Sequence, residues 1–403
     1  MHAVEEKAPD GAVGHRVAVQ RKLAGLTQQQ LATRAHVSKS LVSHVERGLL
    51  PASPAFTAAA AHALGVDVAT LTGEPYGPPI TDPRAEHAGI PALRAALDCD
   101  EDPDLDSFPL PPAELRAKLD ECDRNRSRSH YAQMLAVLPE LLNHAYLIVD
   151  AAQPGHEAET AWALLDDAYE LAHVVSLRFG YYDLAALAAR CGRDTAAKAG
   201  DPLRAAVATF RYTGVRLRRS DYAAVLRVVD RGHALLEGEH SQTANAVRTV
   251  LHLRQARVHA RLGVRDRADE HIDEARRLVA GGVPAHPYYS VNAIPANVDM
   301  HHVEVPVELS DGTTAVSRAE QVQLPQDAQP SLAGHHSVCV ARAWTLHGDR
   351  AKALSALHSA RKIAPQQTRY HPSVHETVHM LAETDRRATD TLAGFARWLG
   401  VHL

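Results

Sequence analysis

Apolar residues recur at the three- and four-residue spacing of helices through most of the chain, and the sharpest pattern lies between residues 26 and 48. Thr27 and Gln30 form a T-x-x-Q capping box, which predicts the start of one helix. Ser38, a favoured N-cap residue, predicts the start of a second helix, and Gly48 predicts its end. Two short amphipathic helices joined by a tight turn have the geometry that places the second helix in the major groove of DNA.

The surrounding residues extend this pattern to a five-helix domain. The apolar faces of its second and third helices consist of Leu31, Ala32, Ala35, Leu41, Val42 and Val45. His36 stands at the turn between them, where backbone of positive φ is expected, and His adopts such backbone more readily than most residues other than Gly. Ser53 followed by Pro54 predicts the start of a fourth helix, which runs to Leu64. A fifth short helix is expected at residues 67–71.

Residues 16–72 resemble the XRE family of helix-turn-helix repressors, which includes the phage Cro-like proteins. The resemblance rests on Arg21, Leu26-Thr27-Gln28, Leu31-Ala32, Val37-Ser38, Val42-Ser43, Glu46-Arg47-Gly48 and Ala63-Leu64-Gly65-Val66. It covers about one seventh of the chain and implies a lambda-repressor-like domain that binds double-stranded DNA. It also implies a homodimer on a pseudo-palindromic operator and a contact between Gln28 and the DNA backbone.

The recognition helix should carry the side chains that read DNA. Base readout needs donors and acceptors at the exposed start of that helix, and helix N-termini attract phosphate through their N–H groups and dipole. The predicted DNA contacts are Arg21, Thr27, Gln28, Gln29, Ser38, Lys39, Ser40, Ser43, His44 and Arg47. Because Ser and Thr hydroxyls serve many base edges, the sequence does not predict the operator.

Charge is distributed unevenly along the chain. Residues 11–50 contain six Lys or Arg and one acidic residue, Glu46, whereas the whole chain has a net charge of −5. This local positive excess predicts the DNA footprint. Phosphate would repel Glu46 if it faced the DNA. We therefore expect Glu46 to pair with Arg21 and to fix the first helix against the recognition helix.

Composition narrows the class of protein further. The four cysteines are far apart and form no C-x-x-C pair, which argues against zinc fingers and a disulfide framework and fits a reducing, cytoplasmic compartment. The chain has no apolar run of 18 or more residues that would predict a membrane span. Phosphate-loop and esterase motifs do not occur in a usable context, so we expect no enzyme activity and no cofactor.

Residues 74–112 differ from the segments on either side. Pro recurs, and acidic residues cluster between positions 98 and 106. Such a composition is typical of a semi-rigid or disordered tether, within which residues 89–97 alone show a short helical pattern. We expect this tether to join the DNA-binding domain, residues 11–73, to a second domain at residues 113–403.

The second domain shows an internal repeat. Residues 334–367 and 249–282 match the 34-residue tetratricopeptide (TPR) motif, and weaker copies occur near Gly180 and Arg219. The matching positions are Ala256, Gly263, Ala268, Ile272, Ala275, Ala341, Trp344, Gly348, Ala353, Leu357, Ala360 and Pro365. Stacked helix pairs of this kind bury a continuous core and leave a concave groove. The predicted fold is therefore all-α, with a helix-turn-helix domain followed by a TPR-like α-solenoid whose last pair packs Trp398 and Leu399 inward.

The whole layout resembles actinobacterial XRE regulators with C-terminal TPR domains and, more distantly, the peptide-sensing Rgg/PlcR-type regulators. The resemblance implies a groove that binds a peptide or small-molecule signal and sets the geometry of a dimer. Arg257 and Arg342 fall at repeat positions that usually face the groove, where they hold a carboxylate or stay solvated. Asn292 and Asn297, in the irregular segment 281–302, either bind a peptide backbone or form turns. The predicted ligand contacts are Arg257, Asn292, Asn297, His301 and Arg342.

A further motif, His375-Glu376-Thr377-Val378-His379, matches the H-E-x-x-H pattern of zinc proteases. In that chemistry the two His and a third ligand, Asp385, would hold zinc, and Glu376 would act as the base. Ala382 stands where the pattern requires Gly, and the segment is predicted to be a terminal TPR-type helix. We therefore expect a structural role.

Two alternatives to a sensing regulator stay open at this point. One is an array that docks a protein partner and is tethered to DNA, and the more remote one is the zinc protease. The pairs His301-His302 and His335-His336 show no ligand set in the sequence, so we expect them at the surface and expect no metal site.

Overall fold

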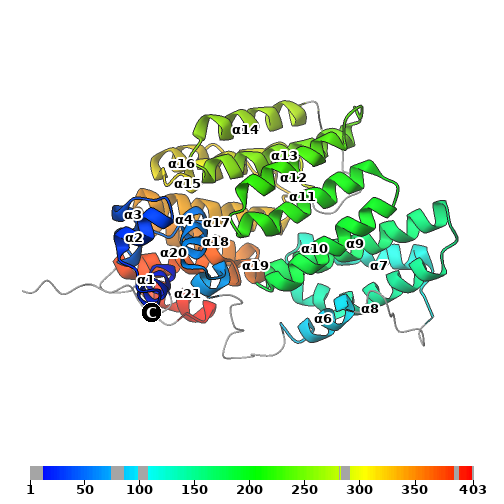
Figure 1. The fold of residues 1–403 in the computed structure, drawn as a ribbon, viewed down its shortest axis with the longest axis horizontal. Helices are drawn as coiled ribbons and strands as arrows, with labels where there is room; N and C mark the ends of the chain where they lie inside the picture. Colours follow the sequence, from blue (N-terminus) through cyan, green and yellow to red (C-terminus); the bar gives the residue numbers. More distant parts are fainter. Residues whose placement is uncertain are drawn as a thin grey trace, which may run out of the picture.

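The computed structural model describes residues 12–73, 86–98, 108–280, 282, 291–384 and 390–401. All regular elements within these ranges are α-helices, as the sequence predicts. Figure 1 shows a small N-terminal bundle, in blue, and a long stack of helices that runs from cyan to red. The bundle lies beside the last helices of the stack and is bonded to one of them.

The N-terminal bundle contains the five predicted helices. They are α1 (Val13–Leu23), α2 (Gln28–Arg34), α3 (Lys39–Glu46), α4 (Pro54–Leu64) and α5 (Val68–Thr72). The hydroxyl of Thr27 accepts a hydrogen bond from the backbone N–H of Gln30, and the side chain of Gln30 accepts one from the backbone N–H of Thr27. The hydroxyl of Ser38 accepts a hydrogen bond from the backbone N–H of Leu41 and so caps α3. These bonds confirm the capping box and the start of the recognition helix.

The bundle has its own hydrophobic core. The most deeply buried members are Val17, Leu31, Val42, Phe56, Ala60 and Leu71. His36 has a φ of 54°, which confirms the expected left-handed turn between α2 and α3. Gly14 allows α1 to approach α3 closely, because a Cβ atom at this position would lie only 2.0 Å from the carbonyl oxygen of Val45.

The rest of the chain stacks as helix pairs joined by short turns (Figure 1). The pairs are α7 (Pro112–Ser127) with α8 (Tyr131–Ala151), α9 (His156–Arg178) with α10 (Tyr182–Lys198), α11 (Pro202–Arg218) with α12 (Tyr222–Ala234), α13 (Gln242–Arg261) with α14 (Arg265–Ala280), α15 (Pro295–Glu308) with α16 (Gly312–Ala319), and α17 (Pro330–His347) with α18 (Arg350–Ile363). The stack ends with α19 (Pro365–Arg369), α20 (Pro372–Thr384) and α21 (Asp390–Leu399).

The two best TPR matches coincide with α13–α14 and α17–α18. Their small and apolar motif residues are buried between the paired helices, namely Ala256, Ala268, Ile272, Ala275, Ala341, Ala353, Leu357 and Ala360. Gly263 and Gly348 adopt positive φ angles of 78° and 95° at the turns. Leu399 is buried in the last core, and Trp398 packs against it. The predicted repeats are therefore confirmed.

Part of the predicted tether folds onto the array. Helix α6 (Ile90–Asp98) buries Ile90, Leu93 and Leu97 in the core of the first helix pairs. The Nδ1 atom of His87 lies 2.9 Å from the hydroxyl of Tyr181. The short helix expected at residues 89–97 is present as α6, and its helical apolar spacing lets it pack against the array. Residues 74–85 and 99–107 of the predicted tether lie outside the described residues.

Helix α8 is long and apolar enough to cross a membrane if only length and composition are considered. In the structure its apolar residues serve the core, where Met134, Leu138 and Leu142 are fully buried. Half of its apolar stretch is covered by the protein itself. The composition of α8 is thus accounted for by its central place among α6, α7 and α9.

The stack curls until its beginning meets its end. The hydroxyl of Tyr131, at the start of α8, donates to Gln367 Oε1 in α19 at 2.9 Å. The backbone N–H of Ala132 donates to Gln366 Oε1 at 3.1 Å, and Arg369 pairs with Glu86. Because these bonds join residues that are far apart in the sequence, the concave side of the array is partly closed.

Candidate functional site

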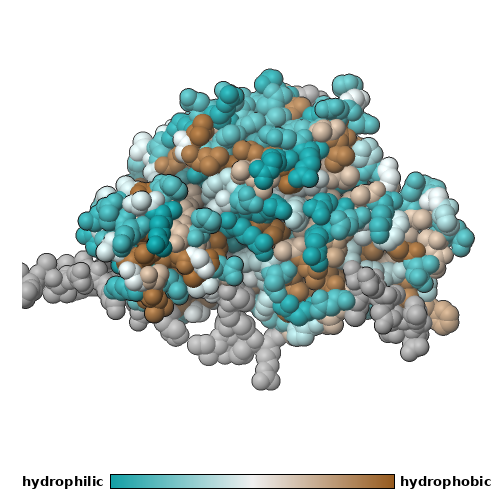
Figure 2. All heavy atoms as spheres, viewed as in Figure 1, coloured by the Kyte–Doolittle hydropathy of each residue, from teal (hydrophilic) through white to brown (hydrophobic). Residues whose placement is uncertain are grey.

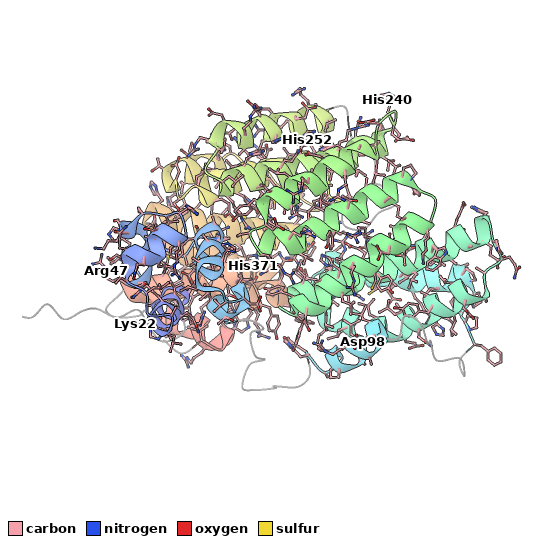
Figure 3. The ribbon with its side chains drawn as sticks, in the orientation of Figure 1. Lys22, Arg47, Asp98, His240, His252 and His371 are labelled. Carbon is pink, nitrogen blue, oxygen red and sulfur yellow. The ribbon has the colours of Figure 1, made fainter. Side chains whose placement is uncertain are left out.

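The recognition helix α3 turns polar side chains outward. Ser38, Lys39, Ser40 and Arg47 are exposed, and Ser43 and His44 are half-buried. Figure 3 places Arg47, together with Lys22 on α1, at the outer edge of the bundle. The side-chain bonds at this face are short-range, such as that from Arg47 Nε to the carbonyl of Ser43. The face is therefore open to a large polyanionic partner.

Arg21 lies inside the bundle. Its Nε and Nη2 atoms donate to the Glu46 carboxylate at 2.6 and 2.9 Å, and its Nη1 donates to the carbonyl of Leu26 at 2.7 Å. Both charged side chains are buried. The expected pairing of Glu46 with Arg21 is confirmed. It corrects the inclusion of Arg21 among the DNA contacts, because all three guanidinium nitrogens are already used inside the domain.

The start of α2 presents the remaining predicted contacts. Gln28 is half-buried, and its Nε2 donates to Glu46 Oε2 at 2.8 Å. Thr27 is exposed, but its hydroxyl takes part in the capping box with Gln30. Gln29 is exposed, and its side chain takes part in neither of these contacts.

A second candidate site is a cavity of about 490 Å³ on the concave side of the array. All five predicted ligand contacts line it: Arg257, Asn292, Asn297, His301 and Arg342. The N-terminal bundle forms part of the same wall through Val13, Pro51, Ala52, Ser53, Pro54, Thr57, Val68 and Thr72. Its volume lies within the range of small-molecule sites. We call this cavity, which both parts of the molecule line, the groove.

The two predicted groove arginines already hold carboxylates of the protein. Arg257 pairs with Glu304, and the Nη2 atom of Arg342 lies 3.7 Å from Glu308 Oε1. Arg261, which the sequence analysis did not single out, pairs with Glu308 at 3.3 Å. Burial alone would raise the pKa of Glu304 and Glu308, but the neighbouring guanidinium groups lower both pKa values. These arginines are therefore already paired with carboxylates of the protein itself.

The Asn residues fold the irregular segment. Asn297 Nδ2 donates to the carbonyl of Asn292 at 2.6 Å, and His301 Nδ1 lies 2.8 Å from the carbonyl of Asn297. The bond from Asn297 agrees with the turn-forming interpretation of this residue, whereas Asn292 takes part through its backbone carbonyl. Burial lowers the pKa of His301 to about 4. The expected surface position is wrong for His301 and for His335, because both line the groove.

Two other arginines in the groove have no such partner. Arg254 lies on α13, and its guanidinium carbon is 4.6 Å from the ring centre of Phe210. Arg178 is the last residue of α9. Within the described part of the chain, neither makes an ion pair. Burial, with the nearby charges of Arg257 and Arg261, lowers the pKa of Arg254 to about 9.

Sequence reasoning missed Arg254, although a signal was present. Arg254, Arg257 and Arg261 recur at three- and four-residue spacing, which places them on one face of a helix. Which of them has a carboxylate partner depends on α15, and the sequence of α13 does not reveal it.

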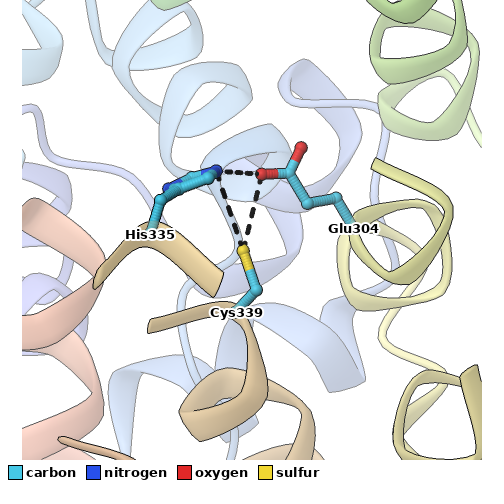
Figure 4. A group of neighbouring side chains, drawn as sticks. All are labelled: Glu304, His335 and Cys339. Atoms are coloured by element: carbon cyan, nitrogen blue, oxygen red, sulfur yellow. Dashed lines mark hydrogen bonds and ion pairs between the residues drawn. The ribbon is translucent and has the colours of Figure 1, made fainter. Parts of the chain in front are cut away.

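Figure 4 shows a cluster around one buried carboxylate in the groove wall. Glu304 Oε1 lies 2.7 Å from His335 Nε2 and 3.5 Å from Cys339 Sγ, and the sulfur lies 3.8 Å from that nitrogen. Carboxylate, imidazole and thiolate are the ligands that zinc prefers, and these three atoms lie within 4.8 Å of one another. Burial and the charge of Glu304 raise the pKa of the Cys339 thiol. A protonated thiol that donates to a carboxylate already paired with Arg257 forms a hydrogen-bonded network.

The H-E-x-x-H motif lies on α20, where it joins the two parts of the molecule. Glu376 Oε1 accepts from the backbone N–H of Ala52 in the bundle at 2.9 Å. His375 Nε2 lies 2.6 Å from the carbonyl of Arg369, and burial lowers the pKa of both His375 and His379 to about 4. Asp385 lies outside the described residues. Within the described residues, the motif Glu and one motif His are thus engaged in packing contacts.

Comparisons with known proteins support the assignment of the first domain as a helix-turn-helix domain. Residues 12–72 match the family described as helix-turn-helix domain. No curated protein matches the sequence. Among solved structures, the chain is similar to PlcR of Bacillus thuringiensis in complex with the peptide PapR7 and DNA. The identity is 13% and the TM-score 0.28, over 88% of this chain and 94% of that one. It is also similar to the P58(IPK) TPR domain, at 15% identity and a TM-score of 0.23, over 93% of this chain and 99% of that one.

The family match and the observed capping and packing of residues 12–72 agree with one another. The stacked helix pairs that follow carry the TPR pattern in their buried positions. The chain therefore carries a helix-turn-helix domain at residues 12–72, followed by a TPR-like helical array.

Proposed function

We propose that this protein is a cytoplasmic, non-enzymatic transcription regulator that binds its operator as a homodimer and changes its DNA affinity when a ligand occupies the groove. The outward polar face of α3 and the positive charge around it support the DNA-binding part. One helix-turn-helix domain reads one half-site, so a pseudo-palindromic operator calls for two copies. The ligand is a peptide or a small molecule.

The observation that carries the regulatory part is the shared wall of the groove. Residues 51–54, which follow the recognition helix, line the same cavity as α9, α13 and α15. A ligand in this cavity touches the bundle and the array together. Since a ligand shifts an equilibrium only by binding one state better, a molecule that fits one placement of the bundle better will favour that placement.

The size of such coupling can be bounded. Coupling free energies between two sites are typically about 1–3 kcal/mol, which corresponds to about 5- to 150-fold in affinity. We therefore expect the groove ligand to change operator affinity within this range. Native mass spectrometry of protein purified from its own host should show a dimer and any retained low-mass ligand.

The DNA-binding part is tested by selecting duplexes from a randomised pool with the full chain and measuring their affinity by fluorescence anisotropy. The double variant Lys39→Ala, Ser43→Ala should bind the selected duplex at least tenfold more weakly, and its affinity should depend less on salt. The matched control is Lys118→Ala, because Lys118 is exposed on α7 in the array. Equal binding by the double variant and the wild type would refute the assigned recognition face.

The regulatory part is tested with the retained ligand and the same duplex. Adding the ligand to ligand-free protein should change operator affinity, and removing it should reverse the change. If no low-mass ligand is retained and host extract leaves operator affinity unchanged, the array acts as a docking scaffold for a protein partner.

A further inference from the structure

We propose that the groove takes an organic anion, a molecule with an apolar body and a carboxylate or similar acidic group, and that Arg254 and Arg178 hold the acidic group. This inference rests on the proposed sensing role of the groove and specifies the chemistry of the ligand. It starts from the charges that line the cavity.

The lining of the groove carries an excess of positive charge. Eight arginines and four glutamates line it, while no lysine and no aspartate of the described residues does. Its four histidines include His173 and His301, and burial lowers the pKa of each to about 4. His173 and His301 therefore add little positive charge near neutral pH, and most of the positive charge of the lining comes from the arginines.

Most of these arginines are accounted for by the protein itself. Arg211 pairs with Asp166 and Glu170, and Arg126 pairs with Asp123. Arg257, Arg261 and Arg342 pair with the two carboxylates of α15. Arg218 lies over the ring of Tyr182, with its guanidinium carbon 3.8 Å from the ring centre. Arg254 and Arg178 remain without a carboxylate among the described residues. An anion of a ligand is the group that would complete their pairing.

The two arginines act on the same part of the groove. Arg254, Arg178 and His173 all line this cavity. Burial is the largest cause of the lowered pKa of His173, and the charges of Arg211, Arg254 and Arg178 lower it further. Arg254 comes from α13 and Arg178 from α9, so an anion between them would bridge two helix pairs of the array.

The fold holds Arg254 in a position that is unfavourable without a ligand. Its guanidinium is half-buried over the ring of Phe210 with two further arginines on the same helix face. A charged group removed from water destabilises a protein unless it is paired. An anion would relieve this repulsion, and its binding would gain from interactions that the protein lacks on its own.

The walls around Arg254 define the rest of the ligand. Apolar lining residues from α9, α11 and α13 surround it, namely Val174, Leu177, Phe210, Val250 and Leu253. Such a combination of apolar walls with a few oriented charges is typical of sites for small organic ligands. A bare inorganic ion would leave these walls without contact. The cluster of Glu304, His335 and Cys339 lies in the same lining but holds its own counter-ion, Arg257.

The test uses a pair of fluorescent probes that differ in one charged group. Anilinonaphthalene sulfonate has an apolar body and an acidic group, whereas phenylnaphthylamine has the same rings without the sulfonate. Wild-type protein should bind the sulfonate probe with one site per chain and bind the neutral probe much more weakly. Arg254→Gln and Arg178→Gln should each weaken the sulfonate probe by about ten- to a hundredfold, as expected for the loss of a charged hydrogen bond. Neither change should alter binding of the neutral probe.

Two controls separate charge from folding. Arg267→Gln removes a positive charge from the exposed side of α14, where Arg267 pairs with Glu270, and should leave both probes unaffected. Arg254→Lys keeps the charge and should restore part of the affinity. The proposal is overturned if both probes bind wild-type protein equally well, or if Arg254→Gln binds the sulfonate probe as the wild type does.

The source of the natural anion is resolved by competition. Short peptides with a free C-terminal carboxylate, the same peptides as C-terminal amides, and small dicarboxylic acids should be tested for displacement of the sulfonate probe. Displacement by free-acid peptides and not by amides identifies a peptide terminus, and displacement by dicarboxylic acids identifies a small metabolite. Displacement by amides as well would contradict the role of the anion. Operator affinity of ligand-free Arg254→Gln should equal that of the wild type, so a failure of DNA binding is distinguishable from a failure of the groove.

Discussion

The recognition face and the groove use the same residue types in opposite ways. On the recognition face, Lys39 and Arg47 are exposed and make no ion pair among the described residues. In the groove, Arg257 and Arg261 are held against buried carboxylates. DNA supplies a dense row of negative charges to any exposed cation, whereas a small ligand needs a site whose charges are already oriented. Exposure and partners, rather than residue type, therefore distinguish the two sites.

Figure 2 shows the consequence on the surface of the molecule. The outer faces of the helices are mainly hydrophilic, and apolar patches appear between helices. In Figure 3, Arg47 lies at the outer edge of the bundle, whereas His371, which lines the groove, lies where the bundle and the array meet. The recognition face is exposed to a large partner, whereas the groove is a cavity lined by both the bundle and the array.

The largest effect is expected from breaking the buried pair that supports the recognition face. Arg21→Ala leaves the Glu46 carboxylate buried without its cation, and loss of one partner of such a pair typically costs about 3–5 kcal/mol. Because the bundle is a small domain, we expect it to unfold well below the melting temperature of the array. Circular dichroism and differential scanning calorimetry of Arg21→Ala should show two transitions, with the bundle transition at a lower temperature than in the wild type.

Arg47→Ala is the matched comparison for Arg21→Ala. Arg47 is exposed, so its loss should change stability by less than about 0.5 kcal/mol while it weakens DNA binding. The comparison fails if Arg47→Ala destabilises the bundle as much as Arg21→Ala does.

The bundle could be predicted from the sequence because its determinants are local. The capping box at Thr27, the N-cap at Ser38 and the left-handed turn at His36 each depend on residues within a few positions. The TPR repeats were predictable for a related reason, since small residues and Gly turns recur at a fixed spacing. The pair of Arg21 and Glu46 followed from charge, because an acidic residue facing DNA is unfavourable, and from the family resemblance, which includes both residues.

For the groove, the sequence predicted residues that line the cavity but not the residues with which they form ion pairs. The five predicted residues do line one cavity, but their partners Glu304 and Glu308 come from a different helix. Cys339 and His335 meet Glu304 only through the packing of α17 on α15. The link from α20 to the bundle joins residues more than 300 positions apart. Such pairings arise from the curvature of the whole array, which no local pattern encodes.

A smaller effect is expected from the buried histidine of α20. The pKa of His375 is lowered to about 4 by burial and, to a lesser degree, by the charges of His379 and Arg16. The neutral His375 side chain contributes fully to the free energy of unfolding above the unfolded-state pKa of about 6.5. This contribution is lost as the pH falls toward 4. Between pH 6.5 and 5, this group alone should lower the free energy of unfolding by about 1.5 kcal/mol.

The variant His375→Gln keeps a donor for the carbonyl of Arg369 but cannot titrate. Its urea unfolding should therefore be less sensitive to acid than that of the wild type. His156→Gln is the control, since His156 is exposed at the start of α9. An equal loss of stability with acid in His375→Gln and wild type would show that His375 is not buried as described.

Loss of the hydrogen bond between Glu376 on α20 and Ala52 in the bundle should lower the free energy of unfolding by about 1 kcal/mol. Glu376→Ala leaves the N–H of Ala52 without its acceptor, and a typical hydrogen bond contributes about this much. Burial raises the pKa of Glu376, while the backbone N–H groups of Ala52 and Val13 oppose that rise. Glu376→Gln keeps an acceptor without a buried charge, so it should hold the bundle at least as well as the wild type.

Hydrogen exchange of the Ala52 amide measures this contact directly, because this N–H donates to Glu376. Exchange should be faster in Glu376→Ala and unchanged in Glu376→Gln. Equal protection in all three proteins would mean that the array does not hold the bundle through α20, and the two sites would then be independent.

The smallest effect, and the one that separates the two kinds of groove arginine, is expected at Arg254. Replacing Arg257 removes the cation from buried Glu304 and should destabilise the array. Arg254→Gln instead removes a half-buried charge that has no carboxylate partner and is repelled by Arg257 and Arg261. The relief of that repulsion is offset by the lost contact with Phe210, which is worth about 0.5–1 kcal/mol. The net change in the free energy of unfolding should therefore be small, within about 1 kcal/mol of zero. Urea denaturation of ligand-free protein checks the size of this change, and a clear loss of stability in Arg254→Gln would place Arg254 among the structural arginines of the groove rather than among those that await a ligand.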